Sequence, residues 1–161
     1  MESGRHAAGV DFATEALLPV APQLVWNVLT DYDRIASFVP GLAASRLVSG
    51  GGEPLLLEQR LRVASGGFHF EAVVVLRVEE RPYQEIRFEA VDGNLREMRG
   101  EWSIGDLGEG SRLAYRLRLV PGFWLPPVLG PKLIRDGFRA QFDALTTEMM
   151  RRAGAASAGT V

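Results

Sequence analysis

The side chains that could carry chemistry in this chain are few, and they do not form a catalytic set. Histidine occurs only at His6 and His69, and there is no cysteine. Because His69 alternates with Phe68 and Phe70, we expect its imidazole to point away from the core. A transition-metal site would then depend on carboxylates alone, which is uncommon for zinc. We therefore predict no catalytic residue, no metal and no cofactor.

Polar residues at positions predicted to face inward are more informative. They are Thr14, Gln59, Arg96, Tyr115 and Gln141. Buried polar groups need hydrogen-bond partners, and a ligand pocket uses a few such groups to orient the bound molecule. The alternative is that Tyr115 and Gln59 bond to each other or to the backbone inside a filled core, and that Arg96 lies at the rim.

Strands must position these residues, because apolar side chains recur at every second position along most of the chain. The first strand starts at Val10, and six more segments follow residue 41, separated by turn signals rich in Gly, Pro, Asp and Asn. The clearest inward sets are Leu55, Leu57, Gln59, Leu61 and Val63; Phe68, Phe70, Ala72, Val74, Leu76 and Val78; Ile86, Phe88 and Ala90; Met98, Gly100, Trp102 and Ile104; and Leu113, Tyr115, Leu117 and Leu119. The opposite faces carry Arg and Glu side chains that can pair across strands.

Helices are predicted at two places. Pro22 suits the first position of one short helix, and Asp31 can cap a second over Tyr32 to Val39. Apolar residues at helical spacing predict a last helix from Pro131 to Arg152. At ~1.5 Å per residue this helix would be about 33 Å long, enough to cross the concave face of a curved sheet. Since short loops favour antiparallel neighbours, we predict an α+β fold with a seven-stranded curved antiparallel sheet around the last helix.

Two glycines lie at inward positions of these elements. Gly137 lies inside the last helix, where glycine costs about 1 kcal/mol relative to alanine. Gly100 lies inside a strand, where it packs nothing. Close packing or space for a ligand would explain both.

Length and composition limit the class of protein. The 161 residues fit one domain, which we place at 10–152 between flexible tails at 1–9 and 153–161. The net charge of −2 comes from interspersed acidic and basic residues, so we expect no nucleic-acid partner. The sequence shows neither a signal peptide nor the roughly 18 consecutive apolar residues of a membrane span, and we predict a cytoplasmic protein.

Several motifs give the chain a family resemblance. They include residues 21–26 (APQLVW), 29–34 (LTDYDR), 38–41 (FVPG), 110–115 (GSRLAY) and 123–127 (FWLPP). With the order of elements, these motifs resemble the START-like, or helix-grip, superfamily, in its polyketide cyclase and coenzyme Q-binding protein branch. The resemblance covers about residues 10–152. It implies a cavity between the sheet and the last helix that binds a hydrophobic small molecule similar to a quinone, a lipid or a polyketide.

We predict the cavity residues from the inward sets and the stripe of the last helix. They are Thr14, Phe38, Gln59, Leu61, Phe70, Val74, Phe88, Arg96, Met98, Gly100, Trp102, Tyr115, Leu117, Ile134, Gly137, Phe138, Gln141 and Phe142. The leading hypothesis is a non-enzymatic carrier. The alternatives are a polyketide aromatase/cyclase or dehydratase, in which Tyr115 or Arg96 would assist enolisation or dehydration, and a protein-interaction module related to toxins that act on ribosomes.

Two surface features suggest further partners. Phe123, Trp124 and Leu125 form an apolar cluster before the last helix that can plug the end of the core, gate the pocket or contact a membrane peripherally. Val73 and Val75 point outward from their strand and would suit a homodimer.

Overall fold

The computed structural model describes residues 9–48, 54–65 and 67–159, and in it a seven-stranded antiparallel sheet curls around one long helix. The elements are β1 (Val10–Leu18), α1 (Pro22–Leu29), the short 3-10 helix η2 (Ile35–Ser37), β2 (Leu42–Leu47), β3 (Leu55–Ser65), β4 (Phe68–Arg81), β5 (Glu85–Gly93), β6 (Leu95–Asp106), β7 (Ser111–Pro121) and α2 (Leu129–Gly159). The strand order β1-β7-β6-β5-β4-β3-β2 is a meander from β2 to β7, closed by β1 on the far side of β7. The predicted helix-grip architecture is confirmed.

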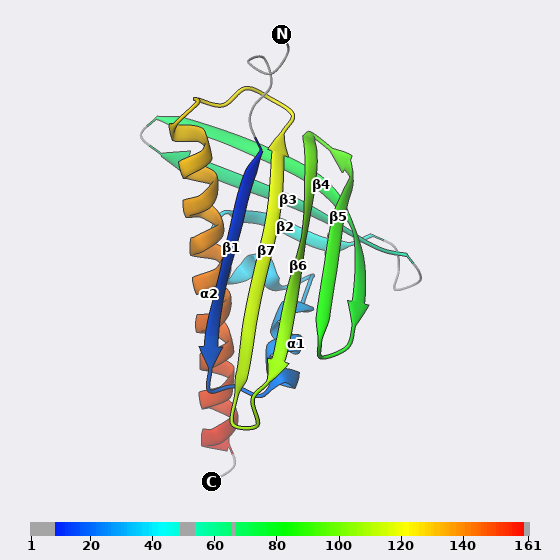
Figure 1. The fold of residues 1–161 in the computed structure, drawn as a ribbon, viewed down its shortest axis with the longest axis vertical. Coiled ribbons are helices and arrows are strands. Elements are labelled where there is room, and N and C mark those ends of the chain that lie inside the picture. Colours follow the sequence, from blue (N-terminus) through cyan, green and yellow to red (C-terminus); the bar gives the residue numbers. More distant parts are fainter. Residues whose placement is uncertain (1–8, 49–53, 66, 160–161) are drawn as a thin grey trace.

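The curl of the sheet gives the molecule an inside and an outside. In Figure 1, β2 and β3 cross behind β7 and β1, and α2 runs along β1. The alternation predicted from the sequence holds in the strands that form the middle of the core. Leu57, Leu61, Val74, Leu76, Val78, Ile86, Met98, Ile104, Leu113, Tyr115, Leu117 and Leu119 are all buried. Their burial supplies most of the driving force for closing the sheet around α2.

The segment between α1 and β2 is less helical than predicted. Instead of a helix from Tyr32 to Val39, only the three residues of η2 are helical. The carboxylate of Asp31 does not cap this turn, because it accepts a hydrogen bond at 3.0 Å from Arg152 at the other end of the chain. Only the backbone carbonyl of Asp31 serves the turn, accepting from the backbone N–H of Ile35 at 2.9 Å.

The last helix is longer than the predicted span from Pro131 to Arg152. Its first turn is closed by a hydrogen bond of 2.7 Å from the N–H of Gly130 to the carbonyl of Pro126. At the other end, the segment predicted as a flexible tail is helical as far as Gly159. Its alanines favour helix by intrinsic propensity, which the apolar stripe used to place the predicted end did not take into account. The stripe itself is buried at Ile134, Phe138, Phe142, Leu145 and Met149.

The two inward glycines have different explanations. A Cβ at Gly100 would lie 2.4 Å from the carbonyl oxygen of Arg116 and 2.6 Å from Cζ of Phe88. Close packing therefore requires glycine there. At Gly137 the nearest atom to an added Cβ would be Cγ2 of Val63, at 4.0 Å. The helix thus has unused space opposite β3.

A cluster of charges fastens the C-terminal half of α2. Arg151 and Arg152 both donate hydrogen bonds to Glu148, at 2.7 and 2.8 Å, and Arg152 also reaches Asp31. Hydrogen bonds first from Arg151 and then from Arg152 lower the pKa of Glu148 to about 2, against the opposing effect of its burial. The cluster therefore joins α2 to the segment after α1.

We predict opposite effects for alanine at the two glycines. Gly100→Ala should lower the free energy of unfolding by about 1–3 kcal/mol, because backbone and the Phe88 ring must move to admit the methyl group. Gly137→Ala should raise it by up to about 1 kcal/mol, because the helix gains propensity and nothing is displaced. Urea denaturation of both variants measures this, and equal destabilisation would contradict the assignment of space at Gly137.

The pKa of Glu148 predicts a dependence of stability on pH. Because this pKa is lower in the folded than in the unfolded chain, the ionised carboxylate stabilises the fold above about pH 4.5, and the effect is lost as the pH falls toward about 2. At pH 7, Glu148→Gln should therefore lower the free energy of unfolding by up to about 1 kcal/mol, as expected for ion pairs whose arginines are partly exposed to water. Denaturation at pH 7 and pH 2 measures the difference in the free energy of unfolding between the wild type and Glu148→Gln. If this difference is the same at both pH values, the ionised carboxylate of Glu148 is not its cause.

Candidate functional site

An internal cavity of about 80 Å³ lies between the sheet, the segment after α1 and the middle of α2. Its lining residues are Leu29, Tyr32, Ile35, Val39, Leu42, Leu57, Gln59, Leu61, Leu76, Val78, Ile86, Phe88, Met98, Trp102, Tyr115, Phe138, Gln141 and Leu145. The predicted residues among them are Gln59, Leu61, Phe88, Met98, Trp102, Tyr115, Phe138 and Gln141. The structure thus brings part of the predicted set together around one space.

Three predicted cavity residues with polar or surface roles lie elsewhere. Thr14 accepts a hydrogen bond of 2.8 Å from Arg139, in the seam between β1 and α2. Phe38 lies under the guanidinium of Arg152, with 5.4 Å from Cζ to the ring centroid. Arg96 is exposed, because the pairing of β6 with β7 shifts register between Leu95 and Glu97 and takes Arg96 out of the inward alternation.

The other predicted residues outside the lining pack within the core. Phe70 lies against Phe123, with ring centroids 5.4 Å apart. Of the two explanations offered for Gly100, close packing holds, because the ring of Phe88 lies there, and Gly137 faces Val63. The remaining four are buried core residues: Val74, Leu117, Ile134 and Phe142.

The hydroxyl of Tyr115 has no hydrogen-bond partner in the core. Tyr115 is 5% exposed, and its ring stacks on Trp102 at 3.8 Å between centroids. Within the described residues, every side-chain nitrogen or oxygen that is inaccessible to a water-sized probe has a hydrogen-bond partner. The Tyr115 hydroxyl has no partner among them, so it must border open space, and the space that this side chain lines is the cavity. Burial raises the pKa of Tyr115 above its usual range, which keeps the hydroxyl protonated as a donor.

Two glutamines add amide groups to the lining. Nε2 of Gln59 donates to Oγ of Ser45 at 3.2 Å. The bond between Gln59 and Tyr115 that a filled core would allow is therefore not made. Gln141 has no hydrogen-bond partner among the described residues, and its Nε2 lies beside Gly41. Together with Tyr115 they give a largely apolar cavity a few polar groups.

Sequence reasoning missed the contribution of the segment after α1. Tyr32, Ile35 and Val39 line the cavity from that side. The Tyr32 hydroxyl donates to Oε2 of Glu80 at 2.5 Å, and burial, reinforced by Glu80, raises the pKa of Tyr32. The signal was present, since Tyr32 and Ile35 fall at inward helical spacing. The pattern shows which side chains face inward but not which of them border a void.

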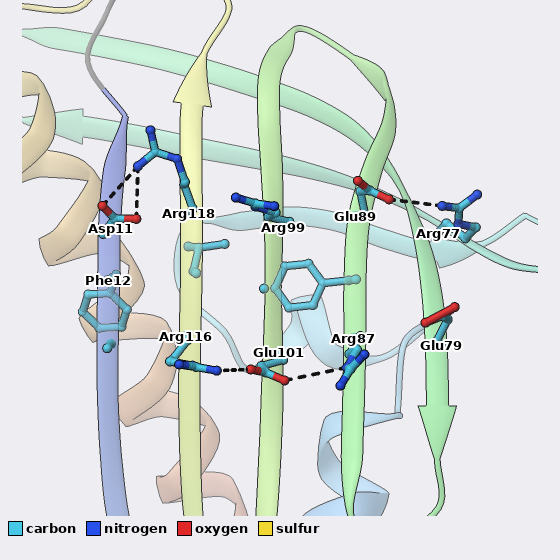
Figure 2. Close-up of a pocket in the computed structure, with 14 residues that line it drawn as sticks. Asp11, Phe12, Arg77, Glu79, Arg87, Glu89, Arg99, Glu101, Arg116 and Arg118 are labelled. Carbon is cyan, nitrogen blue, oxygen red and sulfur yellow. Dashed lines mark hydrogen bonds and ion pairs between the residues drawn. The ribbon is translucent and has the colours of Figure 1, made fainter.

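A second hollow lies on the outer face of the sheet and was not predicted as a site. It has a volume of about 880 Å³ and is lined mainly by charged side chains of β1, β7, β6, β5 and β4. Figure 2 shows these side chains in two rows across the strands. One row contains Arg118, Arg99 and Glu89, and the next contains Arg116 and Glu101.

Most charges of this outer groove already pair with one another. Asp11 accepts from Arg118 at 3.1 Å, and Glu89 accepts from Arg77 at 3.1 Å. Glu101 lies between Arg116 and Arg87, and the hydrogen bond from Arg116 lowers its pKa. The groove is therefore the water-facing ladder of cross-strand ion pairs that the sequence predicted for this face.

The apolar cluster before α2 is divided between inside and outside. Phe123 packs on Phe70, and Leu125 is buried. Trp124 is 73% exposed and Val128 85% exposed. The plugging role expected for this segment thus fits Phe123 and Leu125, whereas membrane contact through Trp124 stays a prediction, as does a homodimer through Val73 and Val75.

The described parts of the chain offer few other kinds of site. Across these residues, no group of three or more His, Asp or Glu side chains is placed to hold a metal ion. His69 is exposed on β4, as expected, and His6 lies outside the described residues. In the same residues, no helix is both long and apolar enough to cross a membrane.

The size of the cavity limits what it holds in this structure. Ligand pockets commonly measure about 300–1,000 Å³, and a single water needs about 10–15 Å³ on a comparable measure. At about 80 Å³, the cavity has room for a few waters or a very small molecule. A quinone, lipid or polyketide would require it to widen.

A curved antiparallel sheet that grips a long helix around an apolar cavity defines a helix-grip protein. The chain belongs to the family "Polyketide cyclase / dehydrase and lipid transport", whose family model matches residues 18–146. No curated protein matches the sequence.

Solved structures show the same fold at low sequence identity. The Zhui aromatase/cyclase from Streptomyces sp. R1128 is 17% identical, with a TM-score of 0.74 over 91% of this chain and 96% of its own. A START superfamily protein from Mycobacterium smegmatis is 14% identical, with a TM-score of 0.73 over 88% and 97%. A STAR-related lipid transfer protein from Xanthomonas axonopodis is 18% identical, with a TM-score of 0.68 over 86% and 84%. These likenesses establish the fold.

We predict that the two cavity tyrosines differ in their effect on stability. Tyr32→Phe should lower the free energy of unfolding by about 1–2 kcal/mol, because Glu80 loses its hydrogen-bond donor. Tyr115→Phe should change it by less than about 0.5 kcal/mol, because the hydroxyl has no protein partner to lose. Urea denaturation compares the two, and a large loss for Tyr115→Phe would show that its hydroxyl is bonded within the protein.

Proposed function

We propose that this protein binds an apolar small molecule in the internal cavity, with the ring of the ligand among the aromatic side chains and a hydrogen-bond acceptor of the ligand on the Tyr115 hydroxyl. The observation that carries the proposal is that hydroxyl, a donor on a buried side chain that has no protein partner and borders the cavity. Leaving such a group unpaired in a low-dielectric interior costs free energy, and a ligand oxygen or water removes that cost.

The rest of the lining suits an aromatic or aliphatic ligand. Trp102, stacked on Tyr115, also lies parallel to Phe142, at 6.1 Å between centroids and an interplanar angle of 5°. Phe88 and Phe138 add two more rings to the lining. Affinity would come mainly from burial of apolar surface, at roughly 25 cal/mol per Å². The ligand classes that agree with this lining and with the family description are quinone-like, lipid-like and polyketide-like molecules.

Binding without reaction agrees better with the lining than catalysis does. Polyketide cyclisation or dehydration requires proton transfer, which needs an acid and a base within reach of the substrate. Among the described residues that line the cavity, none is Asp, Glu or His. The raised pKa of Tyr115 makes it a hydrogen-bond donor rather than a proton donor near neutral pH. We therefore propose a carrier or binding protein ahead of an aromatase/cyclase.

A pair of probes tests this role of Tyr115. Naphthoquinone carries carbonyl acceptors, and N-phenylnaphthylamine is an apolar ring probe without them. Tyr115→Phe should weaken naphthoquinone binding by about 3- to 10-fold, the equivalent of one hydrogen bond, and leave N-phenylnaphthylamine binding unchanged. Tyr83→Phe, outside the cavity lining, is the control and should bind both probes as the wild type does.

Native mass spectrometry with solvent extraction, applied to protein purified from its source, complements the probes. A co-purifying apolar molecule would support a carrier. Protein that emerges empty and binds neither probe would refute the proposed function. Equal weakening of both probes by Tyr115→Phe would instead show that its hydroxyl does not hold a ligand acceptor.

A further inference from the structure

The segment from Asp31 to Leu42 covers one side of the internal cavity. Tyr32, Ile35, Val39 and Leu42 all contribute to the lining from this cover segment. Its regular structure is the short helix η2 and, at its end, Leu42, the first residue of β2, which pairs with Leu61 on β3. Its backbone hydrogen bonds are mostly local, such as those from Ile35 to Asp31 and from Phe38 to Ile35. The cover is therefore a chain of turns laid over the cavity, without a continuous ladder to the sheet.

The cover segment is held to the rest of the molecule at a few points. At one end, Oδ1 of Asp33 accepts from the backbone N–H of Leu47 on the edge strand β2, at 2.9 Å. Tyr32 donates to Glu80 on β4. The backbone N–H of Arg62 on β3 donates to the carbonyl of Gly41 at 2.7 Å. Arg152 on α2, the helix on the opposite side of the cavity, makes two further contacts.

Arg152 is placed to hold the cover closed. Its Nη2 donates to Oδ2 of Asp31 at 3.0 Å, and its guanidinium lies over the ring of Phe38. Its Nε donates to Glu148 at 2.8 Å, which fixes the side chain on α2. The side chain of Arg152 is 25% exposed and that of Asp31 20%, so the pair is only partly screened by water. A planar guanidinium suits this triple role, which an ammonium cannot reproduce.

The cavity cannot admit a ligand of ordinary size without moving one of its walls. Opening the sheet would break strand ladders, and displacing α2 would expose its whole buried stripe. Lifting the cover segment breaks a few side-chain contacts, local turn bonds and the backbone bond between Gly41 and Arg62, and it uncovers the buried side chains of Tyr32, Ile35 and Val39. This loss is smaller than that of a strand ladder or of the whole stripe of α2. We infer that the segment Asp31–Leu42 is the movable cover of the cavity and that Arg152 is its latch, an inference that rests on the proposed function.

Releasing the latch should loosen the cover and speed exchange of a cavity probe. We expect Arg152→Ala to increase hydrogen–deuterium exchange of the 31–42 amides by about tenfold, the equivalent of about 1.4 kcal/mol, with strands β5 to β7 unchanged. In stopped-flow fluorescence, uptake and release of N-phenylnaphthylamine should both accelerate by about tenfold. The ratio of the release and uptake rate constants, which is the dissociation constant of the probe, should change much less, because Arg152 does not line the cavity.

Two variants control for charge and for the salt-bridge cluster. Arg151→Ala removes the other arginine bound to Glu148 but makes no contact with the cover, and it should exchange and bind as the wild type does. Arg152→Lys keeps the positive charge without the planar group and should fall between the wild type and Arg152→Ala.

The outcomes separate the inference from the function on which it rests. Unchanged exchange at 31–42 in Arg152→Ala, or an increase spread equally over the sheet, would overturn the latch. Uptake and release of N-phenylnaphthylamine by Arg152→Ala at wild-type rates would also overturn the role of Arg152 as the latch. Absence of probe binding in the wild type would refute the proposed function, and exchange at 31–42 would still decide whether Arg152 holds the cover.

Discussion

The packing of α2 against the concave side of the sheet is the constraint on which the rest of the structure depends. A single antiparallel sheet has one face to bury, and the meander alone offers nothing large enough to cover it. The stripe from Ile134 to Met149 provides that cover, and it also requires the sheet to curl. Because a helix and a curved sheet meet along a line and not over a whole face, the contact leaves space beside the helix. The cavity is the remainder of that space, closed by the segment after α1.

The two faces of the sheet meet opposite physical demands. On the inside, the lining is largely apolar, and among the described residues the polar groups of Tyr115 and Gln141 have no protein partner. On the outside, polar groups are abundant and neutralise each other across strands, as Asp11 and Arg118 do at one end of the outer groove. A void of about 80 Å³ inside is therefore a more specific candidate site than a hollow of about 880 Å³ outside. A ligand in the outer groove would have to compete with water and with existing ion pairs, each worth little.

Most of the fold could be predicted from the sequence because it rests on periodicity. Alternation located the strands, and the stripe located the middle of α2. The errors arose where a side chain chose a distant partner or where no periodic signal exists. Asp31 was expected to cap a helix, and only the tertiary contact with Arg152 explains why it does not. The alanines that extend α2 beyond Arg152 carry no stripe, so helix propensity was the sole signal there.

The candidate site was harder to predict, because inward direction is a property of the strand whereas bordering a void is a property of the packing. Gly100 and Gly137 illustrate the difference, because the sequence allowed either close packing or space for a ligand at both. The ring of Phe88 fills the first, and only the second is open. The same limit applies to Phe38, which is half-buried against the core but does not border the cavity, and which Arg152 contacts. That contact also gives the small cavity a physical meaning, since a void closed by a few contacts can be small when empty and larger when occupied. With the cover in place, the volume of the cavity then depends more on the contacts that hold the cover than on the size of the ligand.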